Sequence, residues 1–184
     1  MIRNTLAAWG TPARLLHWMV AALVLAQIAL GWVAVSLRLS PLKLDLFVWH
    51  KSIGLVVLAL VVVRILWRSA NPTPAPPAAT AAWERCAARA SHLLLYLVLI
   101  AMPLTGWALN SAANVPFRIF RLVPLPAIVA PNEETAELAA RAHFALFVVL
   151  AALLAVHVGA ALWHHFVRRD DVLIRMLYGA RQRA

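Results

Sequence analysis

Long apolar runs dominate the chain, separated by shorter stretches rich in proline, charge or polar residues. A helix needs about 20 residues to cross the hydrocarbon core of a bilayer, which is about 30 Å thick. Apolar runs of this length are typical of transmembrane helices and not of the amphipathic helices of soluble proteins. We therefore predict an all-α membrane protein, with four spans at residues 15–37, 46–67, 92–109 and 142–166.

The segments between the runs complete a single membrane domain, which we assign to residues 1–184. The third run contains Pro103 and Gly106, so a kink or an early end is expected there. A Pro- and Ala-rich connector over residues 69–91 has room for a short amphipathic helix. Residues 110–140 are expected to form a periplasmic loop along the membrane surface. The first run is too long for a signal peptide, so we expect it to remain in the mature protein.

Composition supports the membrane assignment and narrows the function. Hydrophobic residues make up 64% of the 184 residues and charged residues only 13%, whereas soluble domains carry about a quarter charged residues. The net charge is +10, but its basic residues cluster at the ends of the apolar runs. This pattern indicates membrane topology and not nucleic-acid binding. Cys86, the single cysteine, excludes an internal disulfide and a cysteine-based metal or iron–sulfur cage.

The distribution of lysine and arginine predicts the orientation. Cytoplasmic loops carry the excess of basic residues in membrane proteins. The N-terminus, the second loop and the C-terminal tail share eleven of them, against six on the opposite side. We therefore expect both termini in the cytoplasm. The eleven are Arg3, Arg14, Arg64, Arg68, Arg85, Arg89, Arg168, Arg169, Arg175, Arg181 and Arg183.

Four histidines fall at two predicted depths in the membrane. His17 opens the first span on the cytoplasmic side, and His50 opens the second on the outer side. The fourth span begins outside at His143 and brings His157 close to the cytoplasmic side. Fourteen helical residues rise about 21 Å and return nearly to the same face. The sequence therefore predicts two pairs, His50 with His143 and His17 with His157.

A histidine pair on facing helices is what bis-imidazole haem ligation requires, because the iron takes one imidazole nitrogen on each side of the macrocycle. Two haems at two depths would form an electron path across the bilayer. Zinc or copper transport would need ligands converging at one depth, with carboxylates, cysteine or methionine nearby. A proton pump would need carboxylates within the membrane. The predicted spans contain no acidic residue, with Asp45 only at an edge, so both alternatives are disfavoured.

Four further residues fit the haem hypothesis. Gly31 shares the face of His17 at the outer level, and Gly54 lies one turn from His50, so both would leave room for a porphyrin. Close helix packing is an equally good explanation of these glycines. Arg64 falls at the level of the cytoplasmic haem, where a propionate would be its anionic partner. Lys51 would pair with a propionate or extend to the headgroups.

Several motifs resemble those of the bacterial cytochrome b561 family. They are LLHW at 15–18, WHKSIG at 49–54, VRILWR at 63–68, NPTP at 71–74, SHLLLYLVLIAMPLTGW at 91–107, and the histidines of the fourth run. The resemblance covers nearly the whole chain and is weakest over residues 110–140. It implies a four-helix bundle in the bacterial inner membrane with two haem b groups. It also implies axial ligation by His17, His50, His143 and His157.

The resemblance further implies a function in quinone chemistry. Members exchange electrons with ubiquinone, and some are superoxide oxidases that pass electrons from periplasmic superoxide to the quinone. His164 matches a quinone-site residue of those members, while His165 is expected at the interface and His92 at a quinone, a propionate or the interface. The implied partners are membrane lipid, ubiquinone, and superoxide or another periplasmic donor. The alternative is an electron-transfer subunit that relays electrons between a separate redox protein and the quinone pool.

Overall fold

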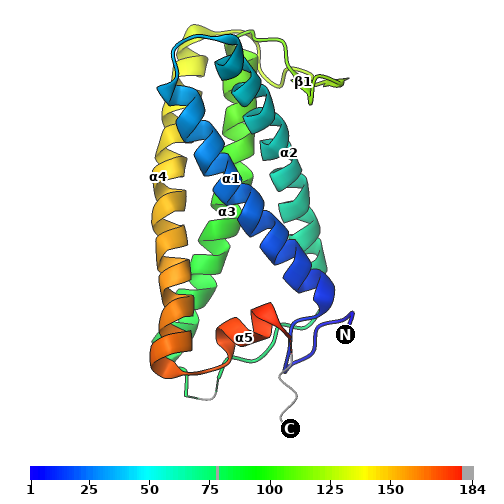
Figure 1. Cartoon of the computed structure of the whole chain (residues 1–184), viewed down its shortest axis with the longest axis vertical. Coiled ribbons are helices and arrows are strands. Elements are labelled where there is room, and N and C mark those ends of the chain that lie inside the picture. The colour runs from blue at the N-terminus through cyan, green and yellow to red at the C-terminus, as the bar shows by residue number, and fades with distance from the viewer. Residues whose placement is uncertain (78, 180–184) are drawn as a thin grey trace.

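The computed structural model describes residues 1–77 and 79–179, so Arg181 and Arg183 lie outside the described residues. Four long helices run along the longest axis of the molecule (Figure 1) and are apolar enough to cross a membrane. This confirms the predicted helical membrane architecture, whereas the orientation of the termini stays a prediction. The helices are α1 (Thr11–Ser36), α2 (Pro41–Ser69), α3 (Ala82–Ala112) and α4 (Glu133–Trp163).

Helix α3 differs most from its predicted span. It begins at Ala82, where the backbone N–H of Ala81 donates to the Glu84 carboxylate at 2.8 Å. The amphipathic segment expected in the connector is therefore the first part of α3. Of the kink or early end expected at Pro103 and Gly106, the early end does not occur, because the helix continues to Ala112, and the kink stays a prediction. Pro103 has no N–H to donate to the carbonyl of Leu99, four residues earlier, but proline is tolerated inside membrane helices. Two residues later, the Thr105 hydroxyl bonds to the carbonyls of Ala101 and Met102.

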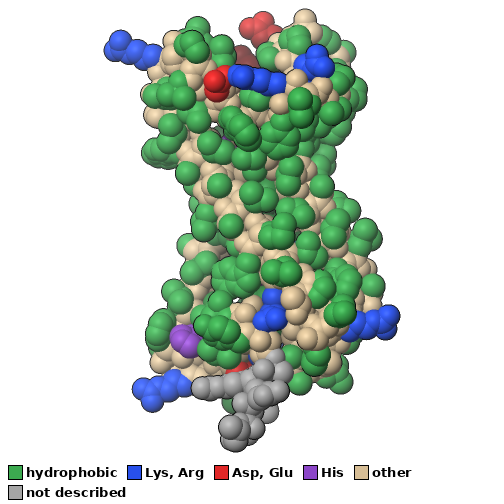
Figure 2. Space-filling model, turned by 45° about the vertical axis from the view of Figure 1, so that its right-hand side comes forward, with side chains coloured by type: hydrophobic (Ala, Val, Ile, Leu, Met, Phe, Trp, Pro, Cys, Tyr) green, Lys and Arg blue, Asp and Glu red, His purple; other side chains and the backbone are tan. Residues whose placement is uncertain are grey.

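The surface of the bundle is apolar where a membrane would contact it. The buried core is a narrow column of mostly valine and leucine side chains between the helices. Larger hydrophobic residues such as Trp32, Leu97 and Phe144 are exposed. Figure 2 shows hydrophobic side chains over the middle of the molecule, with most charged side chains gathered at its two ends. This distribution suits a hydrocarbon surrounding.

The two ends of the bundle carry different structures. One end, called the hairpin end here, holds a short antiparallel hairpin of β1 (Arg118–Ile119) and β2 (Val123–Pro124). The other end, the α5 end, holds a π-helical turn η1 (His164–Arg168) and the short helix α5 (Val172–Leu177). The N-terminus lies at the α5 end (Figure 1). There the Trp18 Nε1 donates to the carbonyl of Met176 at 3.1 Å, which ties α1 to α5.

Candidate functional site

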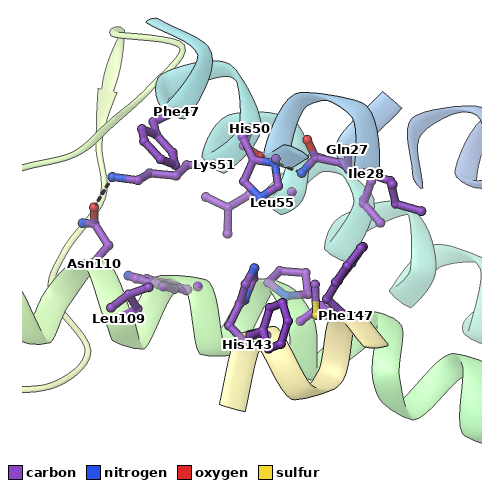
Figure 3. A pocket seen from close by; sticks show the side chains of 18 of the residues that line it. Gln27, Ile28, Phe47, His50, Lys51, Leu55, Leu109, Asn110, His143 and Phe147 are labelled. Carbon is purple, nitrogen blue, oxygen red and sulfur yellow. Dashed lines mark hydrogen bonds between the residues drawn. The ribbon is translucent and has the colours of Figure 1, made fainter. Parts of the chain in front are cut away.

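A cavity of about 520 Å³ lies inside the hairpin end of the bundle. His50 enters it from α2 and His143 from α4, and Figure 3 shows the two side chains on opposite sides of the space. Their ring centroids are 6.4 Å apart, with the ring planes at 74°. Most of the remaining lining is aliphatic or aromatic, including Phe47 and Phe147. The cavity is therefore an apolar chamber with two imidazoles facing each other.

The separation of the two rings suits a shared metal ion. Imidazole nitrogens bind metals such as zinc at about 2.0–2.1 Å, so two rings on opposite sides of one ion have centroids roughly 6 Å apart. The Nδ1 of His50 is buried and has no hydrogen-bond partner among the described residues. Buried polar atoms are ordinarily paired, so the protein alone does not satisfy this ring. The residues of the chamber therefore fit a haem held between His50 and His143.

Thr105 orients the ring of His143. The Thr105 hydroxyl lies 3.1 Å from His143 Nδ1 and 2.9 Å from each of the Ala101 and Met102 carbonyls. The single hydroxyl proton goes to a carbonyl, so the hydroxyl oxygen is left to accept from an Nδ1–H group. That tautomer leaves Nε2 unprotonated and able to bind a metal. Metal-binding histidines are commonly fixed in this way by a hydrogen bond at the other nitrogen.

Glycines bring the backbone close to the two imidazoles. A Cβ on Gly31 would lie 3.1 Å from Cε1 of His50, and one on Gly106 would lie 3.3 Å from Cε1 of His143. A Cβ on Gly54 would lie 3.0 Å from the Gln27 amide nitrogen, which donates to the His50 carbonyl at 2.7 Å. All three glycines line the cavity. Gly31 and Gly106 therefore make space for the histidine rings.

A second group of imidazoles lies toward the α5 end. His17 of α1 and His157 of α4 have ring centroids 6.2 Å apart, close to the separation of the first pair. The structure adds His92 of α3, whose ring lies 5.4 Å from that of His157. The sequence predicted the His17–His157 pairing but left the role of His92 open. The fold thus brings together the two histidines of each pair, and one pair lies toward each end of the bundle.

Arg64 lies near the second group and is held by neutral partners. Its Nε donates to the Tyr96 hydroxyl at 3.1 Å, and its Nη1 donates to the Ala13 carbonyl at 3.2 Å. No carboxylate forms an ion pair with it in the described part of the chain. Ionisable residues within membrane spans pair with one another or with backbone carbonyls, and both partners of Arg64 are uncharged. This guanidinium is therefore available to an anion such as a haem propionate.

Lys51 lies at the edge of the hairpin-end cavity. Its Nζ donates to Oδ1 of Asn110 at 2.5 Å (Figure 3) and lies 5.5 Å from the centre of the Phe117 ring. Since both partners are neutral, the lysine charge is not cancelled by either of them. The structure gives Lys51 a place in the cavity lining. It therefore stays a candidate for contact with an anionic group.

His164 and His165 open the π-helical turn η1, which follows the last α-helical residue of α4. His164 Nδ1 lies 2.5 Å from a carboxylate oxygen of Asp170, and both side chains are largely buried. The His165 ring packs edge-on against Phe166, with centroids 4.8 Å apart. Sequence reasoning identified His164 but missed its carboxylate partner.

Several other residues of the sites were not anticipated. They share one signal, a small or polar residue inside or beside an apolar run. They are Gln27, Thr105, Gly106, Asn110 and Asp170.

Comparison with known proteins identifies the family of the chain. The family model described as prokaryotic cytochrome b561 matches residues 8–179. The chain is 35% identical over 175 residues to cytochrome b561 homolog 2 of Escherichia coli K12, covering 95% of this chain and 93% of the relative. It is 32% identical to cytochrome b561 homolog 1 of the same organism, over 88% of this chain and 92% of the relative. It is 28% identical to a protein of Yersinia pestis named probable superoxide oxidase CybB, over 88% and 91% of the two chains.

Four apolar helices and this family together indicate a multi-pass protein of the inner membrane. The family also implies a b-type haem as the cofactor. From the matched family model and its relatives, we conclude that the chain belongs to the prokaryotic cytochrome b561 family and is a membrane electron-transfer protein.

Proposed function

We propose that the protein holds two haem b groups and transfers electrons across the inner membrane to ubiquinone, most specifically from periplasmic superoxide. His50 and His143 would hold one haem, and His17 and His157 the other. The observation that carries this proposal is the pair of matching ring separations, 6.4 Å and 6.2 Å. Haems bound by these residues would supply one-electron redox chemistry at two levels of the membrane.

The proposed direction places the hairpin end in the periplasm and the α5 end in the cytoplasm. Its support is the excess of lysine and arginine at the segments that meet at the α5 end. The N-terminus lies at that end as well (Figure 1). In this orientation the cavity of His50 and His143 is the one nearer to superoxide.

Superoxide is an anion, and Lys51 is the residue best suited to attract it to the cavity. Arg121 and Arg141 are compensated by ion pairs with Asp45 and Glu137, respectively. Lys51 is bonded to a neutral amide instead and lines the cavity. Lys43 and Arg118 also have neutral partners, but they do not line the cavity. An uncompensated charge beside an apolar cavity raises the local concentration of an anion and its rate of arrival. The relative named probable superoxide oxidase supports the choice of this donor.

The overall reaction balances when two superoxide anions are oxidised for each ubiquinone that is reduced. Two superoxide anions each lose one electron and become O₂, and one ubiquinone takes the two electrons with two protons to become ubiquinol. The protons come from the cytoplasmic side. His164 lies at that side and is the candidate to hydrogen-bond the quinone carbonyl, which suits a general acid.

The test is a stopped-flow experiment with the purified haem-loaded protein. Superoxide should reduce the haem faster than superoxide disproportionates, and added ubiquinone should then reoxidise it. Absence of haem reduction within the lifetime of superoxide would exclude the superoxide oxidase activity. If ubiquinone still reoxidised haem that had been reduced chemically, electron transfer to ubiquinone would stay in place.

A second candidate function is a relay subunit between a redox protein and the quinone pool. The observation that favours it is the group of exposed apolar side chains on the loop of the hairpin end, namely Val115, Leu122, Val123 and Ile128. Exposed apolar patches are common at protein contacts. Co-purification of a redox partner that reduces the haem would favour the relay, whereas full turnover by the isolated chain would count against it.

A further inference from the structure

The contact between His164 and Asp170 is a half-buried carboxylate–imidazole pair outside the two proposed haem sites. Asp170 Oδ2 lies 2.5 Å from His164 Nδ1, and the side chains are 18% and 21% exposed. A carboxylate at Nδ1 keeps the proton on that nitrogen and stabilises the ring when it becomes positively charged. Nε2 is then the atom through which His164 would exchange a proton with a substrate.

The local backbone is built to hold this pair. The turn η1 replaces α-helix from His164 onward, and Arg169 then adopts a left-handed conformation with φ of 54°. This brings the chain back so that the N–H of Asp170 donates to the His164 carbonyl at 3.2 Å. The other carboxylate oxygen of Asp170 accepts from the N–H of Val172 at 3.1 Å, at the start of α5. Asp170 is therefore held between the His164 ring and the start of α5.

Two of the neighbouring arginines are paired with other carboxylates. On η1 and α3, Arg168 pairs with Glu84, and on α5 Arg175 pairs with Asp171. Arg169 forms no ion pair among the described residues. In the described part of the chain, Asp170 is therefore the carboxylate that contacts His164. Among the described residues, the charge of a protonated His164 ring is therefore balanced by this one carboxylate.

We propose that Asp170 is a positioning residue that keeps His164 able to donate a proton from Nε2 to the reduced quinone. This rests on the proposed function, in which quinone is reduced at the α5 end. In the step, the Nε2–H bond of the imidazolium breaks and an O–H bond forms on a quinone oxygen that has received an electron. His164 becomes neutral and regains a proton from cytoplasmic water. Of the two protons that each quinol needs, His164 passes on at least one.

The decisive variant is Asp170→Asn in the haem-loaded protein. Asparagine keeps an oxygen for the Val172 N–H, and its amide donates to Nδ1, so the turn and a hydrogen-bonding Nε2–H remain. It cannot balance the charge of an imidazolium. The protein is reduced without oxygen, mixed with a short-chain ubiquinone at several concentrations, and followed by haem absorbance. Quinone binding to the oxidised protein is measured separately by quenching of tryptophan fluorescence.

We expect Asp170→Asn to lower the maximal reoxidation rate at least about tenfold, since general acid catalysis is worth about 10²–10⁴. The half-saturating quinone concentration and the binding constant should stay within about twofold of wild type, and a solvent deuterium isotope effect should appear. Asp170→Glu should recover most of the rate. The matched control is Asp171→Asn, which removes the neighbouring carboxylate that pairs with Arg175; it should behave as wild type.

An unchanged maximal rate in Asp170→Asn, or an equal loss in Asp171→Asn, would overturn the assignment of Asp170. A loss of quinone binding with an unchanged maximal rate would overturn it as well. These outcomes differ from failure of the proposed function. In that case the wild-type haem itself would not be reoxidised by ubiquinone, and both proposals would be rejected together.

Discussion

His50 on α2 and His143 on α4 face each other across an apolar cavity, with ring centroids 6.4 Å apart. His17 and His157 repeat this relationship toward the other end of the bundle, at 6.2 Å. Helix α4 supplies one member of each pair, so its two histidines set the spacing between the proposed haem sites. The predictions below test the pairs and the residues that support them.

Removing one histidine should empty one site and leave the other. His50→Ala or His143→Ala should abolish haem binding mainly at the hairpin-end site, because a lone axial imidazole leaves the opposite face of the iron without its ligand. His17→Ala or His157→Ala should abolish haem binding mainly at the second site. The measurement is the haem-to-protein ratio of each purified variant, together with its reduced-minus-oxidised spectrum.

The control for these variants is His165→Ala, because His165 packs against Phe166 and belongs to neither pair. It should keep the wild-type haem content. Retention of two low-spin haems in all four ligand variants would refute the pairing.

Gly31 should be intolerant of a side chain. A Cβ there would lie 3.1 Å from the His50 ring, and overpacking of a filled site costs about 1–3 kcal/mol. Gly31→Ala should therefore reduce occupancy of the hairpin-end site and shift its spectrum. Gly159→Ala is the matched control, since a Cβ at Gly159 meets no atom within 4 Å. Equal effects of the two substitutions would show that only helix stability had changed.

Thr105 should affect the haem affinity and reduction potential of the hairpin-end site through its hydrogen bond to His143. Thr105→Val keeps the shape but removes the acceptor for the Nδ1–H group, and loss of such a partner typically costs 10–100-fold in metal affinity. We expect a weaker haem affinity and a changed reduction potential at the hairpin-end site alone. Thr105→Ser should restore both quantities, because it retains the hydroxyl. The readouts are haem titration and a potentiometric titration, and identical curves for Val and Thr would contradict the role.

Lys51 should affect the reaction with superoxide more than the haem itself. Lys51→Met removes the charge that Asn110 holds at the cavity. Since charge steering raises association rates about 10–10³-fold, the second-order rate of haem reduction by superoxide should fall roughly tenfold. Its dependence on ionic strength should also weaken. Lys51→Arg should remain close to wild type, and an unaltered rate in Lys51→Met would remove this lysine from the proposed path of the donor.

The helices and the histidine pairs were predictable because they depend on regular geometry. Apolar length defines a span, and the fourteen residues between His143 and His157 define two levels on one helix face. The length of α3 was not predictable in this way. Pro103 suggests an end, but membrane helices tolerate proline and this helix continues to Ala112.

The supporting contacts were missed because they join segments far apart in the sequence. Nothing near Thr105 indicates that His143 lies beside it, and nothing near Lys51 indicates that Asn110 lies beside it. The hairpin is held similarly, since the N–H of Phe120 donates to the buried Ser52 hydroxyl at 2.8 Å. The Asp170–His164 contact is local, but it requires a π-helical turn and a left-handed Arg169. Hydrophobic periodicity predicts neither the π-helical turn nor the left-handed residue.

The haem-to-protein ratio of the purified wild-type chain tests the two-site proposal most directly. It is obtained from the absorbance of the extracted haem and the protein concentration. Two haem b groups per chain, both with low-spin spectra, are the expected result. A ratio of one at full loading, or a high-spin spectrum for either haem, would contradict two sites with paired histidine ligands.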